Sequence, residues 1–102
     1  MSFSPNENHE ITLAEASVMT EAYRDANLNS KIGGFFGKDA IQQILNQSEC
    51  VGLKFYFAMK NGNLTLVLCG AKANQDDLYL GYLADQCLPD PPHSSSSNPL
   101  NS

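Results

Sequence analysis

The sequence has few basic residues, few cysteines and histidines, and no long apolar run. Lysine and arginine together number 6 against 11 aspartates and glutamates, which gives a net charge of −5 at pH 7. Basic residues that are this few and this scattered form no stripe able to neutralise a phosphate backbone, so we expect no nucleic-acid partner. No segment approaches the roughly 18 apolar residues that a transmembrane helix requires, so we expect no membrane partner.

Two further absences concern export and thiol chemistry. Residues 1–10, MSFSPNENHE, lack the basic and apolar segments of a secretory signal, which predicts a cytoplasmic location. The three cysteines (Cys50, Cys69 and Cys87) are an odd number without C-x-x-C spacing, a pattern that favours reduced thiols over disulfides or a zinc site. A chain of 102 residues with 42% apolar residues is predicted to form a single small globular domain.

Residues 51–70, VGLKFYFAMKNGNLTLVLCG, carry the strongest structural signal. Two runs rich in β-formers flank Asn61-Gly62, a pair typical of a two-residue type I′ turn. This turn fixes the predicted register, which pairs Met59 with Leu64, Phe57 with Leu66, Phe55 with Leu68 and Leu53 with Gly70. One face of the predicted hairpin is therefore wholly apolar, whereas the other is mixed.

Two helices are predicted before the hairpin. Thr12 and Glu15 form a capping-box pattern ahead of an apolar stripe, so the first helix begins after Thr12 and ends within residues 27–30. A second helix of about ten residues follows Lys38, with Asp39 placed to complement the helix dipole.

These elements predict an α+β fold. Both helices are expected to pack on one face of an antiparallel sheet, made of the hairpin 51–70 and a third strand at 78–83. Periodicity alone leaves a helical turn open as the alternative for 78–83. We expect a flexible arm at residues 1–10, one domain at 11–88 and an extended or disordered Pro/Ser-rich tail at 89–102. The predicted core residues are Ala16, Met19, Tyr23, Ile41, Ile44, Leu45, Leu53, Phe55, Phe57, Leu66 and Leu68.

The glycine-rich stretch before the second helix is a candidate ligand site. Gly33, Gly34, Gly37 and Lys38 could offer backbone amides and an ammonium group to a small anion. The stretch lacks the spacing of a Walker loop, however. The structural alternative is a tight interhelical turn whose two phenylalanines fill the core.

No catalytic constellation is recognisable, so we predict that the protein is not an enzyme. His9 lies in the arm and His93 in the tail, and neither has a rigid position beside a cysteine. Cys87, Asp90 and His93 could bind a metal only if the tail folded back, and we predict neither a metal site nor a cofactor.

The mixed face of the hairpin is the candidate interface. It carries Lys54, Tyr56, Ala58, Thr65 and Val67, too apolar a set for a purely solvated surface. A second copy of the chain, a different protein, or residues 89–102 could cover it. We expect a homodimer, because self-complementary patches under two-fold symmetry are the commonest solution.

Three stretches, GFFGKDAIQQILNQ, CVGLKFYFAMKNGNLTLVLCGA and the closing NPLN, resemble a family of small uncharacterised bacterial proteins. The resemblance covers most of the chain from Ile11 onward and implies a bacterial cytoplasmic setting. It also implies that the tail is part of the domain. The family has no assigned activity and so implies no site residues. Its members carry cysteines near the prolines, where this chain has residues 89–93, PDPPH, and this departure further disfavours a metal.

Overall fold

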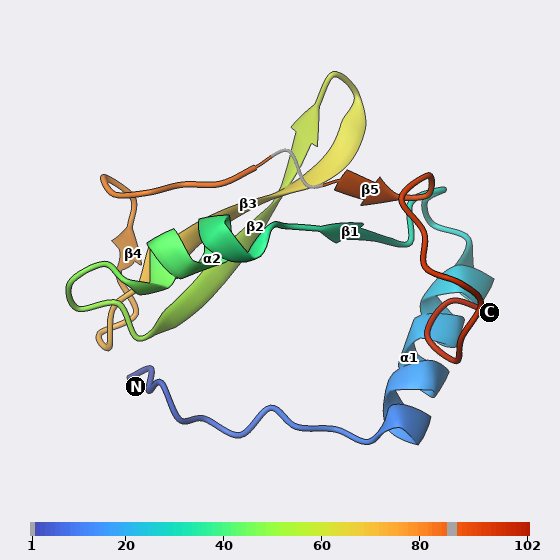
Figure 1. Ribbon diagram of the computed structural model, residues 1–102, viewed down its shortest axis with the longest axis horizontal. Coiled ribbons are helices and arrows are strands. Elements are labelled where there is room, and N and C mark those ends of the chain that lie inside the picture. Colours follow the sequence, from blue (N-terminus) through green and yellow to red (C-terminus); the bar gives the residue numbers. More distant parts are fainter. Residues whose placement is uncertain (1, 86–87) are drawn as a thin grey trace. The chain divides into compact units, whose positions relative to one another are not determined.

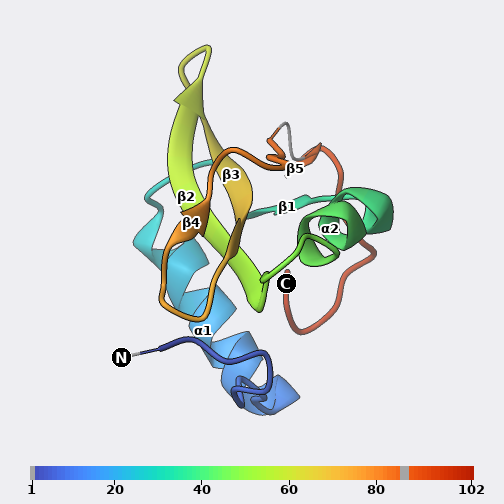
Figure 2. The same cartoon turned by 90° about the vertical axis from the view of Figure 1, so that its left-hand side faces the viewer.

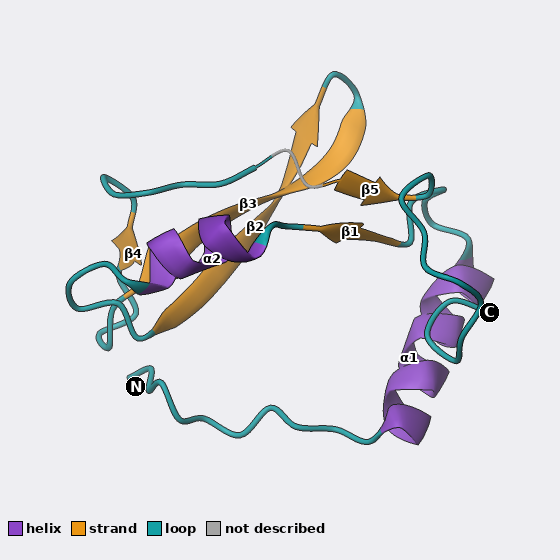
Figure 3. Ribbon diagram, viewed as in Figure 1, coloured by secondary structure: helices purple, strands orange, loops and turns teal. Residues whose placement is uncertain are grey.

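The computed structural model describes residues 2–85 and 88–102. These residues form two α-helices and two antiparallel sheets, which confirms the predicted α+β class (Figure 3). The chain divides into two compact units. Unit 1 comprises Met1–Glu7 and Phe36–Cys87, and unit 2 comprises Asn8–Phe35 and Leu88–Ser102.

The hairpin is the framework of unit 1. Strands β2 (Gly52–Lys60) and β3 (Asn63–Ala71) are joined by Asn61 and Gly62, whose φ angles of 52° and 79° are those of a type I′ turn (Figure 1). The predicted register is confirmed, since Met59 pairs with Leu64 and every pair from Lys60–Asn63 to Leu53–Gly70 follows. Asparagine and glycine tolerate positive φ better than other residues, and the turn therefore sets the pairing.

The third strand is much shorter than predicted. Strand β4 (Asp77–Leu78) pairs antiparallel with β3, and Ala84 forms an isolated bridge with Leu68. The intervening residues 79–83 form no strand, so the prediction of a strand over 78–83 is wrong for most of its length. The Tyr82 amide bonds instead to the side chain of Gln47, just after the second helix (3.0 Å), and the Gly81 amide bonds to the Leu78 carbonyl (3.4 Å).

Helix α2 (Lys38–Leu45) lies along the hairpin and contacts both β2 and β3. Ile44 of this helix is fully buried, and Leu68 of β3 is 6% exposed. An eight-residue helix is only about 12 Å long, whereas a nine-residue strand is about 30 Å long. The turn end of the hairpin therefore extends beyond α2, as the two perpendicular views show (Figures 1 and 2).

Part of the predicted core is not buried. Ile44 and Leu68 are buried as predicted, but five predicted core residues are exposed: Met19, Leu45, Leu53, Phe55 and Phe57. Cys69 and Ala71, on the opposite face of the hairpin, are buried instead. Both belong to β3, which has a neighbouring strand on each side, whereas β2 lies at the edge of the sheet. Burial in unit 1 therefore follows the central strand.

Unit 2 contains helix α1 (Leu13–Ala26). Its predicted capping box is present, with the Thr12 hydroxyl accepting from the Glu15 amide (3.1 Å) and the Glu15 carboxylate accepting from the Thr12 amide (3.1 Å). The helix ends as predicted at Asn27, which has the left-handed conformation (φ 52°). Because α1 and α2 belong to different units, a common sheet face for both helices stays a prediction.

The glycine-rich stretch begins with a strand of unit 2. Strand β1 (Gly33–Phe35) pairs antiparallel with β5 (Leu88–Asp90). The predicted tight turn is thus wrong for these residues, and Phe35 is exposed rather than buried in a core. The guanidinium of Arg24 donates to the carbonyls of Leu100 (2.7 Å) and Ser102, which ties the last residues of the tail to α1. Neither described helix is long and apolar enough to cross a membrane.

Candidate interaction surface

The exposed leucine, phenylalanine and methionine side chains of the hairpin lie in one row along β2. Leu53, Phe55, Phe57 and Met59, hereafter the apolar row, are between 41% and 75% exposed. The rings of Phe55 and Phe57 contact each other edge to face, with centroids 5.7 Å apart. On β3, the side chains of the same face are half-buried or buried. On this face, the side chains of the edge strand β2 are therefore exposed, whereas those of β3 are at least half-buried.

The backbone of the apolar row points out of the sheet edge. The Leu68 amide donates to the Ala84 carbonyl (2.7 Å) and the Ala84 amide donates to the Leu68 carbonyl (3.1 Å), so both groups of Leu68 point away from β2. Opposing residues of an antiparallel pair are either mutually bonded or mutually unbonded, so the groups of Phe55, opposite Leu68, point away from β3. This direction recurs at every second residue and is shared by the whole row. No described strand pairs with this edge.

The opposite face carries a polar cluster built on Asp77 of β4. The Tyr56 hydroxyl donates to one oxygen of this carboxylate, and the Lys54 ammonium lies 2.9 Å from the other. The Tyr56 bond, together with Lys54, lowers the pKa of Asp77, and the bond to Asp77 raises the pKa of Lys54. The ammonium also lies 5.4 Å from the centre of the Tyr56 ring, within the range of a cation–π contact.

The five residues predicted as an interface share this face, as the confirmed register requires. Lys54 and Tyr56 are engaged by Asp77. Ala58, Thr65 and Val67 are half-buried. Larger apolar groups are exposed on the other face, in the apolar row that sequence reasoning assigned to the core.

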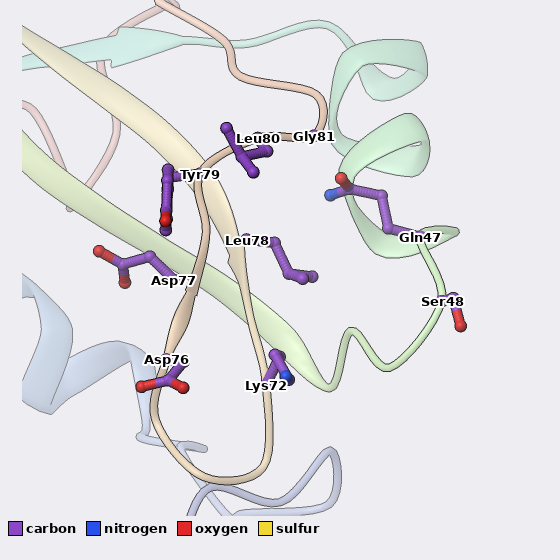
Figure 4. Close-up of a pocket in the computed structure, with 9 residues that line it drawn as sticks. All are labelled: Gln47, Ser48, Lys72, Asp76, Asp77, Leu78, Tyr79, Leu80 and Gly81. Carbon is purple, nitrogen blue, oxygen red and sulfur yellow. The ribbon is translucent and has the colours of Figure 1, made fainter.

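An open pocket of about 660 Å³ lies beside β4 (Figure 4). It lies between the turn that follows α2, which contributes Gln47 and Ser48, and the loop after β4. Its wall carries both signs of charge, with Lys72 on one hand and Asp76 and Asp77 on the other. The full lining is Gln47, Ser48, Lys72, Asp76, Asp77, Leu78, Tyr79, Leu80 and Gly81. Asp77 is committed to Tyr56 and Lys54, so it offers little to a ligand.

The residues of the predicted anion site are divided between the two units. Gly33 and Gly34 belong to unit 2, where they pair with Asp90 and Pro89. Gly37 is the N-cap of α2 in unit 1, and Lys38 is the first residue of that helix. Neither glycine of β1 has the positive φ that would form a looped amide cradle.

The histidines and the described cysteines, Cys50 and Cys69, belong to different units. Unit 1 contains no histidine, because His9 and His93 both belong to unit 2. Cys69 is buried, and this burial raises the pKa of its thiol. Among residues 2–85 and 88–102, no group of three or more histidine, cysteine or acidic side chains is placed to hold a metal ion. Cys87, considered above as a ligand, lies outside the described residues.

Sequence reasoning missed both the apolar row as a surface and Asp77 as the centre of the polar cluster. A signal for the first was present, since a sheet of three predicted strands must have two edge strands. Asp77 gave no comparable signal, because its partners lie more than 20 positions away along the chain.

No protein-family model, no curated protein and no solved structure matches this chain.

Proposed function

We propose that this protein is a non-catalytic interaction module that self-associates through the sheet of unit 1. The observation that carries the proposal is the apolar row: Phe57 is 75% exposed and Met59 is 69% exposed, on a strand with no described neighbour at its outer edge. Exposed apolar side chains that are contiguous and rimmed by polar residues mark interaction sites. A long, apolar, unpaired edge strand is also an established template for pairing with another chain.

The proposal moves the principal contact from the predicted face to its edge. The residues predicted as the interface (Lys54, Tyr56, Ala58, Thr65 and Val67) lie on the opposite face of the same two strands. A bacterial cytoplasmic setting, as implied by the family resemblance, accords with the two described cysteines, Cys50 and Cys69, which are free.

Sedimentation equilibrium across the micromolar range tests the proposal. We expect a mass of twice 11.1 kDa, and a persistent mass of 11.1 kDa would refute self-association. Phe57→Glu should weaken the association about 30-fold, the effect of losing an anchor worth roughly 2 kcal/mol.

The matched control is Leu80→Glu, which introduces the same charge at an apolar side chain of unit 1 that is 89% exposed and lies outside the apolar row. It should leave the dissociation constant unchanged. Far-ultraviolet circular dichroism should be the same for both variants, because neither side chain is buried.

Titration with inorganic phosphate by calorimetry tests the alternative function, anion binding at Gly33, Gly34, Gly37 and Lys38. Heat that disappears in Lys38→Ala would favour it.

A further inference from the structure

We infer that two copies of the chain associate edge to edge through β2, antiparallel, with Tyr56 of one copy directly opposite Tyr56 of the other. This inference rests on the proposed self-association and specifies its geometry. The two three-stranded sheets would then form one continuous sheet of six strands in the order β4-β3-β2-β2-β3-β4. The two-fold axis would pass through the paired Tyr56 residues, perpendicular to the sheet.

The backbone of β2 is already arranged for this pairing. The amide and carbonyl groups of Leu53, Phe55, Phe57 and Met59 point out of the edge, as the bonds between Leu68 and Ala84 establish. These four residues occupy every second position of β2, so their amides and carbonyls can form a ladder of hydrogen bonds with a second strand. Such strand addition provides affinity through main-chain hydrogen bonds, and side chains then determine which partner and which register are accepted.

One register uses all four outward residues. With Tyr56 on the axis, Phe55 lies opposite Phe57 of the second copy and Leu53 lies opposite its Met59. Each of these pairs occurs twice, so the apolar row of one copy continues into the apolar row of the other. Cross-strand aromatic pairs of this kind stabilise antiparallel sheets. They would also cover part of the exposed surface of these side chains.

The lysines of β2 select the same register. With Tyr56 on the axis, Lys54 lies opposite Ala58 of the second copy and Lys60 lies opposite its Gly52, so no two like charges face each other. A shift of the axis to Phe57 would place Lys54 directly opposite Lys60 twice, which is destabilising. A shift to Phe55 would leave Met59 opposite Val51, which precedes the strand. This self-complementary charge pattern is the reason to assign the edge to a second copy rather than to another protein.

Disulfide trapping tests the register. In an unbonded antiparallel pair the two Cα atoms lie about 4.5 Å apart, a distance that a disulfide can span. We expect Tyr56→Cys to form a covalent dimer on treatment with diamide, a thiol oxidant. Lys54 and Lys60 flank this position, so trypsin releases residues 55–60 with one cysteine, and mass spectrometry should find two such peptides joined.

Ala58→Cys is the matched control, because it places the cysteine in the same tryptic peptide and on the same face. Position 58 lies opposite Lys54 of the second copy, so the two introduced thiols would be four residues, or roughly 14 Å, apart along the strand. They should not join. Equal trapping of both variants, or trapping of Ala58→Cys alone, would overturn the register.

Amide hydrogen exchange on the unmodified protein gives a second measurement that needs no variant. In a single copy the amides of Lys54, Tyr56, Ala58 and Lys60 bond to β3, whereas those of the apolar row are free. In the paired dimer both sets should be protected at high protein concentration, and the outward set should lose protection on dilution. Outward amides that exchange freely while the protein sediments as a dimer would refute edge pairing but leave self-association intact. A monomer by sedimentation would refute both.

Discussion

At the scale of single residues, Asp77 connects strands that are distant in the sequence. Its carboxylate accepts a hydrogen bond from Tyr56 and pairs with Lys54, both on β2, although Asp77 itself lies on β4 and the two strands are separated by β3. Three neighbouring strands are thereby linked on one face. A carboxylate shared between a hydroxyl and an ammonium group is stabilised in its ionised form.

This cluster predicts how stability depends on pH. The folded pKa of Asp77 is lowered, so its contribution is present above the unfolded value of about 4 and is lost as the pH falls through the folded value. The pKa of Lys54 is raised, so its contribution is present below about 10.4 and is lost as the pH rises through the folded value.

Asp77→Asn should therefore lower the urea midpoint at neutral pH and have little effect at an acidic pH that protonates the wild-type carboxyl. Urea titrations followed by circular dichroism at the two pH values measure this difference. Glu10→Gln is the control, since this carboxylate is exposed and has no described side-chain partner. An equal effect of Asp77→Asn at both pH values would contradict the assigned ion pair.

Gly81 provides a second prediction at this scale. A Cβ atom at this position would lie 1.7 Å from Oε1 of Gln47, so Gly81→Ala must displace that side chain. Gln47 would lose its bonds to the Tyr82 amide and the Ile44 carbonyl, at about 1–3 kcal/mol for two hydrogen bonds. The free energy of unfolding should fall by this amount.

A double-mutant cycle identifies the cause. In a Gln47→Ala background the clash is absent, so Gly81→Ala should cost much less than it does in the wild type. Additive effects of the two substitutions would show that the Gly81 backbone, rather than Gln47, is the source of the loss.

At the scale of elements, the length of α2 relative to β2 decides which side chains are covered. The helix covers one end of the hairpin and leaves the turn end exposed (Figures 1 and 2). The turn itself must therefore hold the two strands together where no other element supports them. Two strands without a further packing partner are only marginally stable, so the residues of the turn contribute much of the stability of this end.

Gly62→Ala should accordingly destabilise the protein by roughly 1–2 kcal/mol, because Gly62 has a φ of 79° that an alanine adopts only with strain. The urea midpoint measures the loss. Asn63→Ala, one residue further in the strand and equally exposed, should have a smaller effect because its φ is negative. A neutral Gly62→Ala would mean that the turn is not of type I′ in solution.

At the scale of the whole molecule, both units are held by contacts between distant segments. In unit 1 the Phe3 amide donates to the Ala73 carbonyl (2.7 Å), which attaches the first residues to the connection after β3. In unit 2 the ammonium group of Lys31 donates to the Pro91 carbonyl (2.8 Å), and Arg24 binds the end of the tail. A small chain with few buried side chains has little stability to spare, so association would contribute a substantial share.

The stability of the protein should therefore depend on its concentration. For a dimer that unfolds to two chains, each tenfold rise in concentration stabilises the folded state by about 1.4 kcal/mol. Urea midpoints measured over a hundredfold range of concentration should rise for the wild type and for Leu80→Glu. For Phe57→Glu they should stay constant once the protein is monomeric. A wild-type midpoint independent of concentration would argue against the dimer.

The sequence alone determined the features that depend on neighbouring residues. Asn61-Gly62 specified the turn and, through it, nine residue pairs of the hairpin. Thr12 and Glu15 specified the start of α1, and Asn27 its end. These are determined locally because the interacting groups are a few residues apart, and few backbone conformations satisfy them.

Only the tertiary structure decided what covers each face. Alternation identified Phe55 and Phe57 as one apolar face, but an apolar face becomes a core only where another element reaches it. Gly33 and Gly34 were similarly ambiguous, because their strand depends on Pro89 and Asp90, more than 50 residues away. Residues 79–83 form no strand with β3, and the Tyr82 amide bonds to Gln47, which lies 35 positions away. Such contacts depend on element lengths and on distant partners, and local sequence patterns carry no information about either.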